Sequence, residues 1–242
     1  MSLTADAIEK ILQLAPMEQV LLNGALYQTK QLFRVNEPAP KVFTTQTLVS
    51  LVELINKEHN HGRLHDLIIH VSDPTVVDVY SVLREDLGRF HIYKAVAELP
   101  QQMFGQYQDL EKMVIGLKST FVQSDSRDAL VTLLGNITEE AVKTSVDDGF
   151  SQTVTAKTGI ATVSKVPVNP IQLLAPYRTF VEVEQPESEF LLRLQNGQHG
   201  PKAAIFEADG GAWKMAARAN IKAYFEDKLA DLISLGSVVA TE

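Results

Sequence analysis

The sequence contains no cysteine, which excludes disulfides, thiolate nucleophiles and cysteine-ligated metals. Basic residues are also few: 22 Lys and Arg stand against 30 Asp and Glu, a formal net charge of -8. This balance disfavours a dedicated nucleic-acid binder, which needs a basic excess to neutralise phosphates. No segment approaches the ~18 consecutive apolar residues of a membrane span, and no secretory signal pattern opens the chain. We therefore expect no membrane association and a cytoplasmic location.

The chain does have an ordinary globular composition, 45% hydrophobic and 21% charged over 242 residues, long enough to bury a sizeable core. Its hydrophobic periodicity predicts an α+β fold, with two antiparallel β meanders packed by amphipathic helices and a long C-terminal helix. We expect four parts: N-terminal helices and a linker over 1–40, a helix with a three-stranded meander over 41–100, a helical connector over 101–140, and a β-rich lobe with the C-terminal helix over 141–242.

In the first hundred residues, the spacing of the apolar residues changes once, from a helical to a strand period. Apolar residues spaced by three and four predict a helix that includes Ile8 and Ile11, and a second helix that begins at Pro16 and runs to Leu32. A proline-containing linker at 36–40 and a helix over 45–58 follow. Alternation of apolar and polar residues then predicts three strands, over 67–71, 76–82 and 89–96.

The rest of the chain predicts two more helices, over 107–121 and beginning after Ser124, and then mainly strands. A three-residue loop over 147–149 would place Val142 opposite Val154. Prolines at 167 and 170 restrict that segment to a sheet edge or a connector. A second meander is expected over 177–184, 189–195 and 202–207, followed by one helix of about 35 Å from Gly211 to Leu235.

Histidines gather between the third predicted helix and the first strand. His59, His61 and His65 are candidate metal ligands, because imidazole suits zinc, and His70 follows nearby. Their spacing matches no recognised ligand pattern. The alternative is that they are polar side chains beside helix carbonyls.

Four glutamates lie within eight residues: Glu182, Glu184, Glu187 and Glu189. On a strand, Glu182 and Glu184 would share a face and could bind a hard cation or act as acid and base. A solvated hairpin tip is the favoured interpretation, since exposed charges discourage edge-to-edge pairing. A third interpretation is that the glutamates contact a basic patch on a neighbouring subunit, which would include Arg178 or Arg193.

A glycine turn between a strand and a helix contains Asp209, Gly210, Gly211 and Trp213. It lacks the Lys and Ser/Thr of a P-loop and the spacing of a dinucleotide site. We expect Asp209 to cap the helix, the glycines to allow a tight reversal, and Trp213 to anchor the core. The sequence also has no G-x-S-x-G or H-E-x-x-H motif, and we expect no cofactor.

Three phrases share a likeness to known sequences: Val146–Gln152, Ala175–Ser188 and Phe206–Trp213. They resemble the YfdQ-like family, whose members are encoded by tailed phages and prophages. The resemblance covers roughly residues 140–232. It implies a phage-derived protein expressed in a bacterial cell, and it brings no catalytic residue.

Three classes of function remain open. The favoured hypothesis is a non-enzymatic protein that associates with itself into a ring or a shell, in the bacterial cytoplasm or in the virion. A shell related to phage coat proteins would follow from fold analogy alone. The second class is an accessory module that binds a host or phage protein or a small ligand. The third is a metal-dependent enzyme that uses Glu182 and Glu184 or the histidines.

Overall fold

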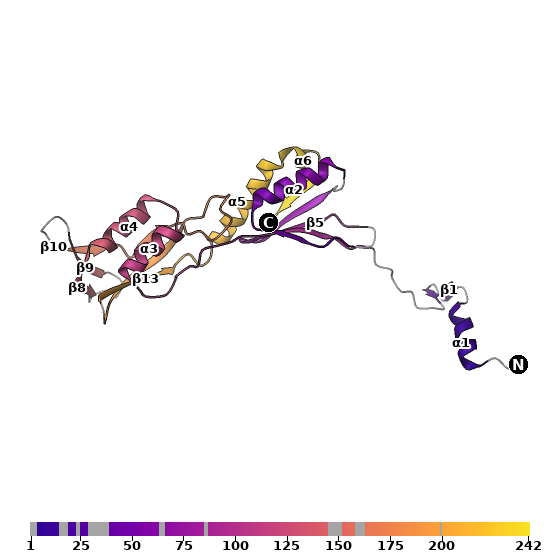
Figure 1. The fold of residues 1–242 in the computed structure, drawn as a ribbon, viewed down its shortest axis with the longest axis horizontal. Helices are drawn as coiled ribbons and strands as arrows, with labels where there is room; N and C mark the ends of the chain where they lie inside the picture. Colours follow the sequence, from indigo (N-terminus) through magenta and orange to yellow (C-terminus); the bar gives the residue numbers. More distant parts are fainter. Residues whose placement is uncertain are drawn as a thin grey trace. The chain divides into compact units, whose positions relative to one another are not determined.

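The computed structural model describes residues 4–14, 19–22, 25–28, 39–62, 66–84, 87–144, 152–157, 163–198 and 200–242. The chain divides into two compact units, Met1–Ala39 and Pro40–Glu242. The fold is α+β, and its described part includes six helices (Figure 1). Among these helices, none combines the length and the apolar character that crossing a bilayer requires.

The N-terminal unit consists of one helix and one β-hairpin. Helix α1 (Ala5–Leu14) includes Ile8 and Ile11, as predicted, and strands β1 (Gln19–Leu22) and β2 (Ala25–Gln28) pair in antiparallel register. The predicted second helix is therefore wrong. Asn-Gly between the strands is a strong signal for a two-residue hairpin connection, and it outweighs the helical spacing of the neighbouring leucines.

The first sheet of the larger unit has five strands in the order β14-β4-β5-β6-β3. The predicted meander forms its centre, as β4 (Leu67–Asp73), β5 (Val76–Ser81) and β6 (His91–Val96). Short strands β3 (Phe43–Thr45) and β14 (Val238–Thr241) pair in parallel with β6 and β4. The sheet is thus mixed rather than purely antiparallel, because these two distant segments join its edges.

Three helices pack on this sheet: α2 (Leu48–Asn60), α5 (Trp213–Lys228) and α6 (Ala230–Ser234) (Figure 1). The expected single C-terminal helix is interrupted at Leu229, whose φ of -118° and ψ of 25° leave the helical region. The apolar stripe continues across the break. The core consists mainly of Leu48, Leu51, Ile55, Ile69, Val77, Val79, Ile221, Phe225 and Leu232.

A second core lies between two helices and a four-stranded antiparallel sheet of order β11-β12-β13-β7. Helices α3 (Leu110–Thr120) and α4 (Asp125–Asn136) match the prediction, and Ser124 caps α4 by accepting a hydrogen bond from Arg127 N at 3.2 Å. The strands are β7 (Gln108–Asp109), β11 (Ile171–Leu174), β12 (Ser188–Gly197) and β13 (Gly200–Glu207).

A third sheet has the order β10-β9-β8, formed by β8 (Ile137–Thr144), β9 (Gln152–Lys157) and β10 (Val163–Val168). Val142 lies opposite Val154, as the loop length predicted, although the loop itself lies outside the described residues. Strand β10 is at the edge, where Pro167 removes no bond from a central ladder.

Gln152 attaches this third sheet to the four-stranded one. Its buried side-chain amide accepts from Leu194 N at 2.9 Å and donates to Leu194 O at 2.8 Å. One side chain thereby pairs with the backbone of β12 as a neighbouring strand would.

We expect Gln152→Ala to lower the free energy of unfolding by about 1–3 kcal/mol, because it leaves a buried N–H and C=O without partners. Urea unfolding followed by circular dichroism measures the change. Gln101→Ala is the matched control, since Gln101 is exposed and should be neutral. Equal effects of the two substitutions would contradict the assignment.

Candidate functional site

The segment that leads from β11 to β12 is a loop, and the predicted strand over 177–184 is wrong. Gln185 explains the difference. Its side-chain oxygen accepts from the backbone N–H groups of Arg178 (3.0 Å) and Thr179 (3.2 Å), and its nitrogen donates to Phe180 O at 2.9 Å. These bonds satisfy backbone groups that a strand would otherwise have paired.

The loop contacts both cores of the larger unit. On one side, Tyr177 N donates to Thr120 O at 2.9 Å, at the end of α3. On the other side, the Thr179 hydroxyl donates to Pro74 O in the turn between β4 and β5. Phe180 is buried in the core of the five-stranded sheet. The loop is therefore one of the segments through which the two cores are joined.

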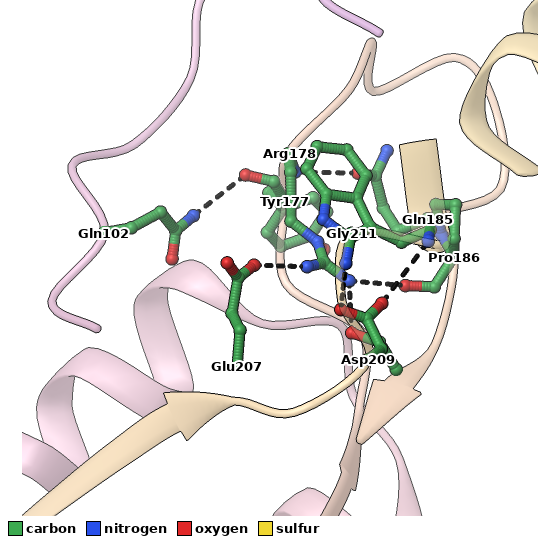
Figure 2. Close-up of polar contacts among 10 residues, drawn as sticks. Gln102, Tyr177, Arg178, Gln185, Pro186, Glu207, Asp209 and Gly211 are labelled. Atoms are coloured by element: carbon green, nitrogen blue, oxygen red, sulfur yellow. Dashed lines mark hydrogen bonds and ion pairs between the residues drawn. The ribbon is translucent and has the colours of Figure 1, made fainter. Parts of the chain in front are cut away.

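Arg178 lies at the centre of this junction and is only 4% exposed. Its Nη1 donates to Glu207 Oε1 at 2.6 Å, and its Nη2 donates to Pro186 O at 3.4 Å and to the Ser188 hydroxyl (Figure 2). The guanidinium carbon lies 4.1 Å from the centre of the Trp213 ring. A planar cation with several donors suits this site, because it can bind the acceptors at its edge while its face contacts an indole.

Burial lowers the pKa of the Arg178 guanidinium from its ordinary value, and the hydrogen bond and negative charge of Glu207 oppose that shift. Asp209 adds a second favourable charge. Arginine stays protonated in proteins, so the buried group remains a cation and depends on these partners. Removing the carboxylate would leave a buried cation with one partner fewer, whereas Glu207, whose side chain is 40% exposed, would keep its contact with water if the guanidinium were removed.

The Asp209 turn supports the indole. Asp209 accepts hydrogen bonds from Gly211 N at 3.0 Å and from Trp213 N at 3.3 Å, at the start of α5. Gly210 and Gly211 have φ values of 62° and 83°, a conformation that side chains with a Cβ rarely adopt. Trp213 is half-buried and contacts Arg178, rather than filling either core as a core anchor would.

Two sequence phrases thus meet in space, Ala175–Ser188 and Phe206–Trp213. The first contributes Arg178 and the second contributes Glu207 and Trp213. Sequence reasoning found these phrases separately but did not predict their contact. An arginine in an otherwise apolar stretch, with an acid at the end of a later strand, was the available signal.

The four glutamates do not act as one group. Glu182 Oε1 accepts from Leu48 N at 2.8 Å and so caps α2, while Glu184, Glu187 and Glu189 are exposed. Because Glu182 and Glu184 lie in a loop, the strand alternation that would have placed them on one face does not apply. The expectation that Arg178 faces a neighbouring subunit is also wrong, since Arg178 is buried within its own chain.

The histidine hypothesis gains no support from the described residues. His59 lies at the end of α2 and His61 is its C-cap, whereas His65 lies outside the described residues. His70 is in β4, with its Nδ1 3.3 Å from the Thr241 hydroxyl. Within the described ranges, no three His, Cys, Asp or Glu side chains are grouped as metal ligands would be.

Asp78 is a buried acid that sequence reasoning missed. The Ser72 hydroxyl donates to its Oδ2 at 2.7 Å, His91 Nε2 lies 3.0 Å from its Oδ1, and Lys94 Nζ lies 3.8 Å away. Asp78 occupies the middle of an apolar strand, which is a detectable signal for a buried, paired carboxylate. These contacts bind three neighbouring strand segments together within the sheet.

The charged and polar groups of the Arg178 cluster are directed at one another, so the cluster is an internal structural contact, here called the Arg178 lock.

In comparisons with protein-family models, curated proteins and solved structures, nothing matched this chain.

We expect Arg178→Met to lower the free energy of unfolding by about 1–3 kcal/mol, because the acceptors at the buried residues Pro186 and Ser188 lose their donor. Arg178→Lys should recover only part of this loss, since an ammonium cannot reproduce the planar contacts. Chemical denaturation measures both. Arg89→Met is the control, because Arg89 is exposed and its replacement should cost under ~0.5 kcal/mol. An Arg178→Met protein as stable as this control would disprove the lock.

Glu182→Ala should destabilise the chain by about 1 kcal/mol, because the first N–H of α2, at Leu48, loses its acceptor while the N-cap Thr47 stays in place. Glu184→Ala, a matched substitution two residues away, should have no effect because that carboxylate has no partner among the described residues. Thermal unfolding of the two variants side by side tests the difference. If both melt together with the parent protein, Glu182 is not a cap.

Proposed function

We propose that this chain is a non-enzymatic phage or prophage protein that associates with copies of itself through its N-terminal unit. The observation that carries the proposal is the exposed apolar face of α1. Ile8, Ile11 and Leu14 recur every three residues and are 47%, 54% and 79% exposed. A helix of ten residues is marginal in water unless it packs on another surface.

The hairpin in the same unit supports the proposal. Strands β1 and β2 form a two-stranded sheet of four residues each. Such an isolated hairpin is also marginal, and it needs a third strand or a packing surface for stability. A neighbouring copy of the chain can supply surfaces for both elements, as in assemblies whose subunits exchange arms.

The biological setting comes from the YfdQ-like resemblance, which supports expression from a phage or prophage gene. We propose a closed ring or a shell, in the bacterial cytoplasm or in the virion. The coat-like version rests on analogy, since phage coat proteins also combine a long helix with meandering sheets. The partner in this proposal is the chain itself.

Light scattering coupled to size exclusion tests the proposal at tens of micromolar protein. The parent chain should have a mass that is a multiple of 26.7 kDa. Ile8→Asp with Ile11→Asp should give a 26.7 kDa monomer, because charged groups would have to be buried at the contact. The control, Glu9→Gln with Lys10→Gln, changes two exposed polar residues of the same helix and should assemble normally.

The urea midpoint of the larger unit distinguishes a loss of assembly from misfolding. The Ile8→Asp/Ile11→Asp variant should have the same midpoint as the parent protein. A parent chain that stays monomeric overturns the proposal and favours the accessory binding module instead.

A further inference from the structure

A groove runs along the four-stranded sheet at its β11 edge. The groove is described by two hollows of about 560 and 350 Å³; the larger is lined by α4 and β11, and the smaller by the residues before α4 and the loop after β11. The two linings are neighbours in sequence, since residues 122–124 of the smaller hollow lead into α4 and its loop residues follow β11. All of the described lining lies between residues 122 and 189, so the groove belongs entirely to the larger unit.

The groove has an apolar floor. Leu130 and Leu133 line it from α4, Ile171 and Leu173 from β11, and Val181 from the loop. Ile171 and Leu173 are 44% and 45% exposed, although they belong to a sheet that otherwise buries its large side chains. Apolar groups that remain open in this way suit a partner that covers them.

Strand β11 also has a free backbone edge. Leu192 N donates to Pro170 O at 2.7 Å, so in this antiparallel register Gln172 and Leu174 direct their backbone groups toward β12. Ile171 and Leu173 therefore direct theirs away from it, and Ile171 N donates to Asn169 Oδ1 at 3.1 Å. Within the described part of the chain, Leu173 N–H and O have no partner. A free edge of this kind can accept an additional strand.

The rim of the groove is acidic. Glu184 and Glu187 line one hollow and Glu189 lines the other, and all three are exposed. None of them forms an ion pair with a described residue, and the described lining includes no Lys or Arg. The occupant should therefore be an extended, apolar segment without acidic residues.

The chain itself contains such a segment. Residues 19–36 include no Asp or Glu, and they carry Lys30 and Arg34. Within them, β1 and β2 are four residues long, the same length as β11. These strands belong to the N-terminal unit, which is compact by itself and needs another strand.

We propose that the β1–β2 hairpin of one copy adds as a strand to the β11 edge of a second copy, with its acid-free flank along the glutamate rim. This inference rests on the proposed self-association and identifies the surface that receives the N-terminal unit. Because donor hairpin and acceptor groove are different surfaces, each copy can give and receive once. Such head-to-tail contacts close into a ring when the rotation permits.

Cross-linking tests the contact directly, because a chain without cysteine gives a clean background. Single-cysteine proteins Gln28→Cys and Leu173→Cys, with tags of different mass, are mixed and treated with a short bismaleimide. Only contact between copies can produce a covalent heterodimer. Gln28→Cys mixed with Val239→Cys is the control, since Val239 is 51% exposed on β14, an edge strand of the other large sheet. We expect about tenfold more heterodimer from the Leu173 mixture, the difference a specific contact makes.

A charge exchange tests the rim. Glu184→Lys with Glu187→Lys should weaken assembly about tenfold, and adding Lys30→Glu with Arg34→Glu to the same chain should restore it. Neither glutamate forms an ion pair within the described part of its own chain, so the folded body should be unaffected, which its urea midpoint checks.

The outcomes separate this inference from the proposed function. Suppose that the parent chain assembles but both cross-linking mixtures react equally, or that the Glu184→Lys/Glu187→Lys variant assembles unchanged. Either result contradicts docking at the groove and leaves the proposed self-association in place. The double variant Gln28→Cys/Leu173→Cys that cross-links only within one chain overturns docking between copies. A monomeric parent overturns both.

Discussion

The buried guanidinium of Arg178 is the constraint on which the larger unit depends. A cation with 4% exposure needs acceptors, and those of its two Nη atoms come from separate segments: Glu207 at the end of β13, Ser188 at the start of β12, and Pro186 in the loop. Its Nε has no partner among the described residues. The Trp213 ring lies over its face at the start of α5. The contacts of this one charged group therefore hold the end of β13, in the four-stranded sheet, beside the start of α5, which packs on the five-stranded sheet.

Several polar side chains of the larger unit form hydrogen bonds with backbone groups in the same way. Gln185 pairs with the backbone of its own loop, Glu182 caps α2 from a distant loop, and Gln152 pairs with the backbone of β12. Each side chain replaces a backbone partner where regular structure ends. These side chains satisfy several backbone groups at the junctions, whereas Arg178 Nε and Gln102 Oε1 are buried there without a hydrogen-bond partner among the described residues.

The sequence predicted elements well where the signal was local. The central meander, helices α3 and α4, the edge position of β10 and the pairing of Val142 with Val154 all follow from periodicity, caps, prolines and loop length. It failed where contacts distant in sequence decided the outcome. Residues 177–184 alternate like a strand, but backbone groups of this segment bond to the Gln185 side chain instead. The helix predicted from Pro16 to Leu32 is replaced by a hairpin in the described residues. The sequence could show that the four glutamates are clustered. It could not show that Glu182 bonds to the first turn of α2 while its neighbours line a groove.

By itself, the sequence determined the α+β class, the acidic charge, the absence of thiol chemistry and most of the amphipathic elements, because each depends on residue type and short-range spacing. Only the tertiary structure decided which edges stay unpaired, that Arg178 is internal rather than displayed, and that β3 and β14 join the meander in parallel. The physical reason is the same in each case. Burial and pairing depend on segments that meet after long loops close, and a one-dimensional pattern carries no record of which segments those are.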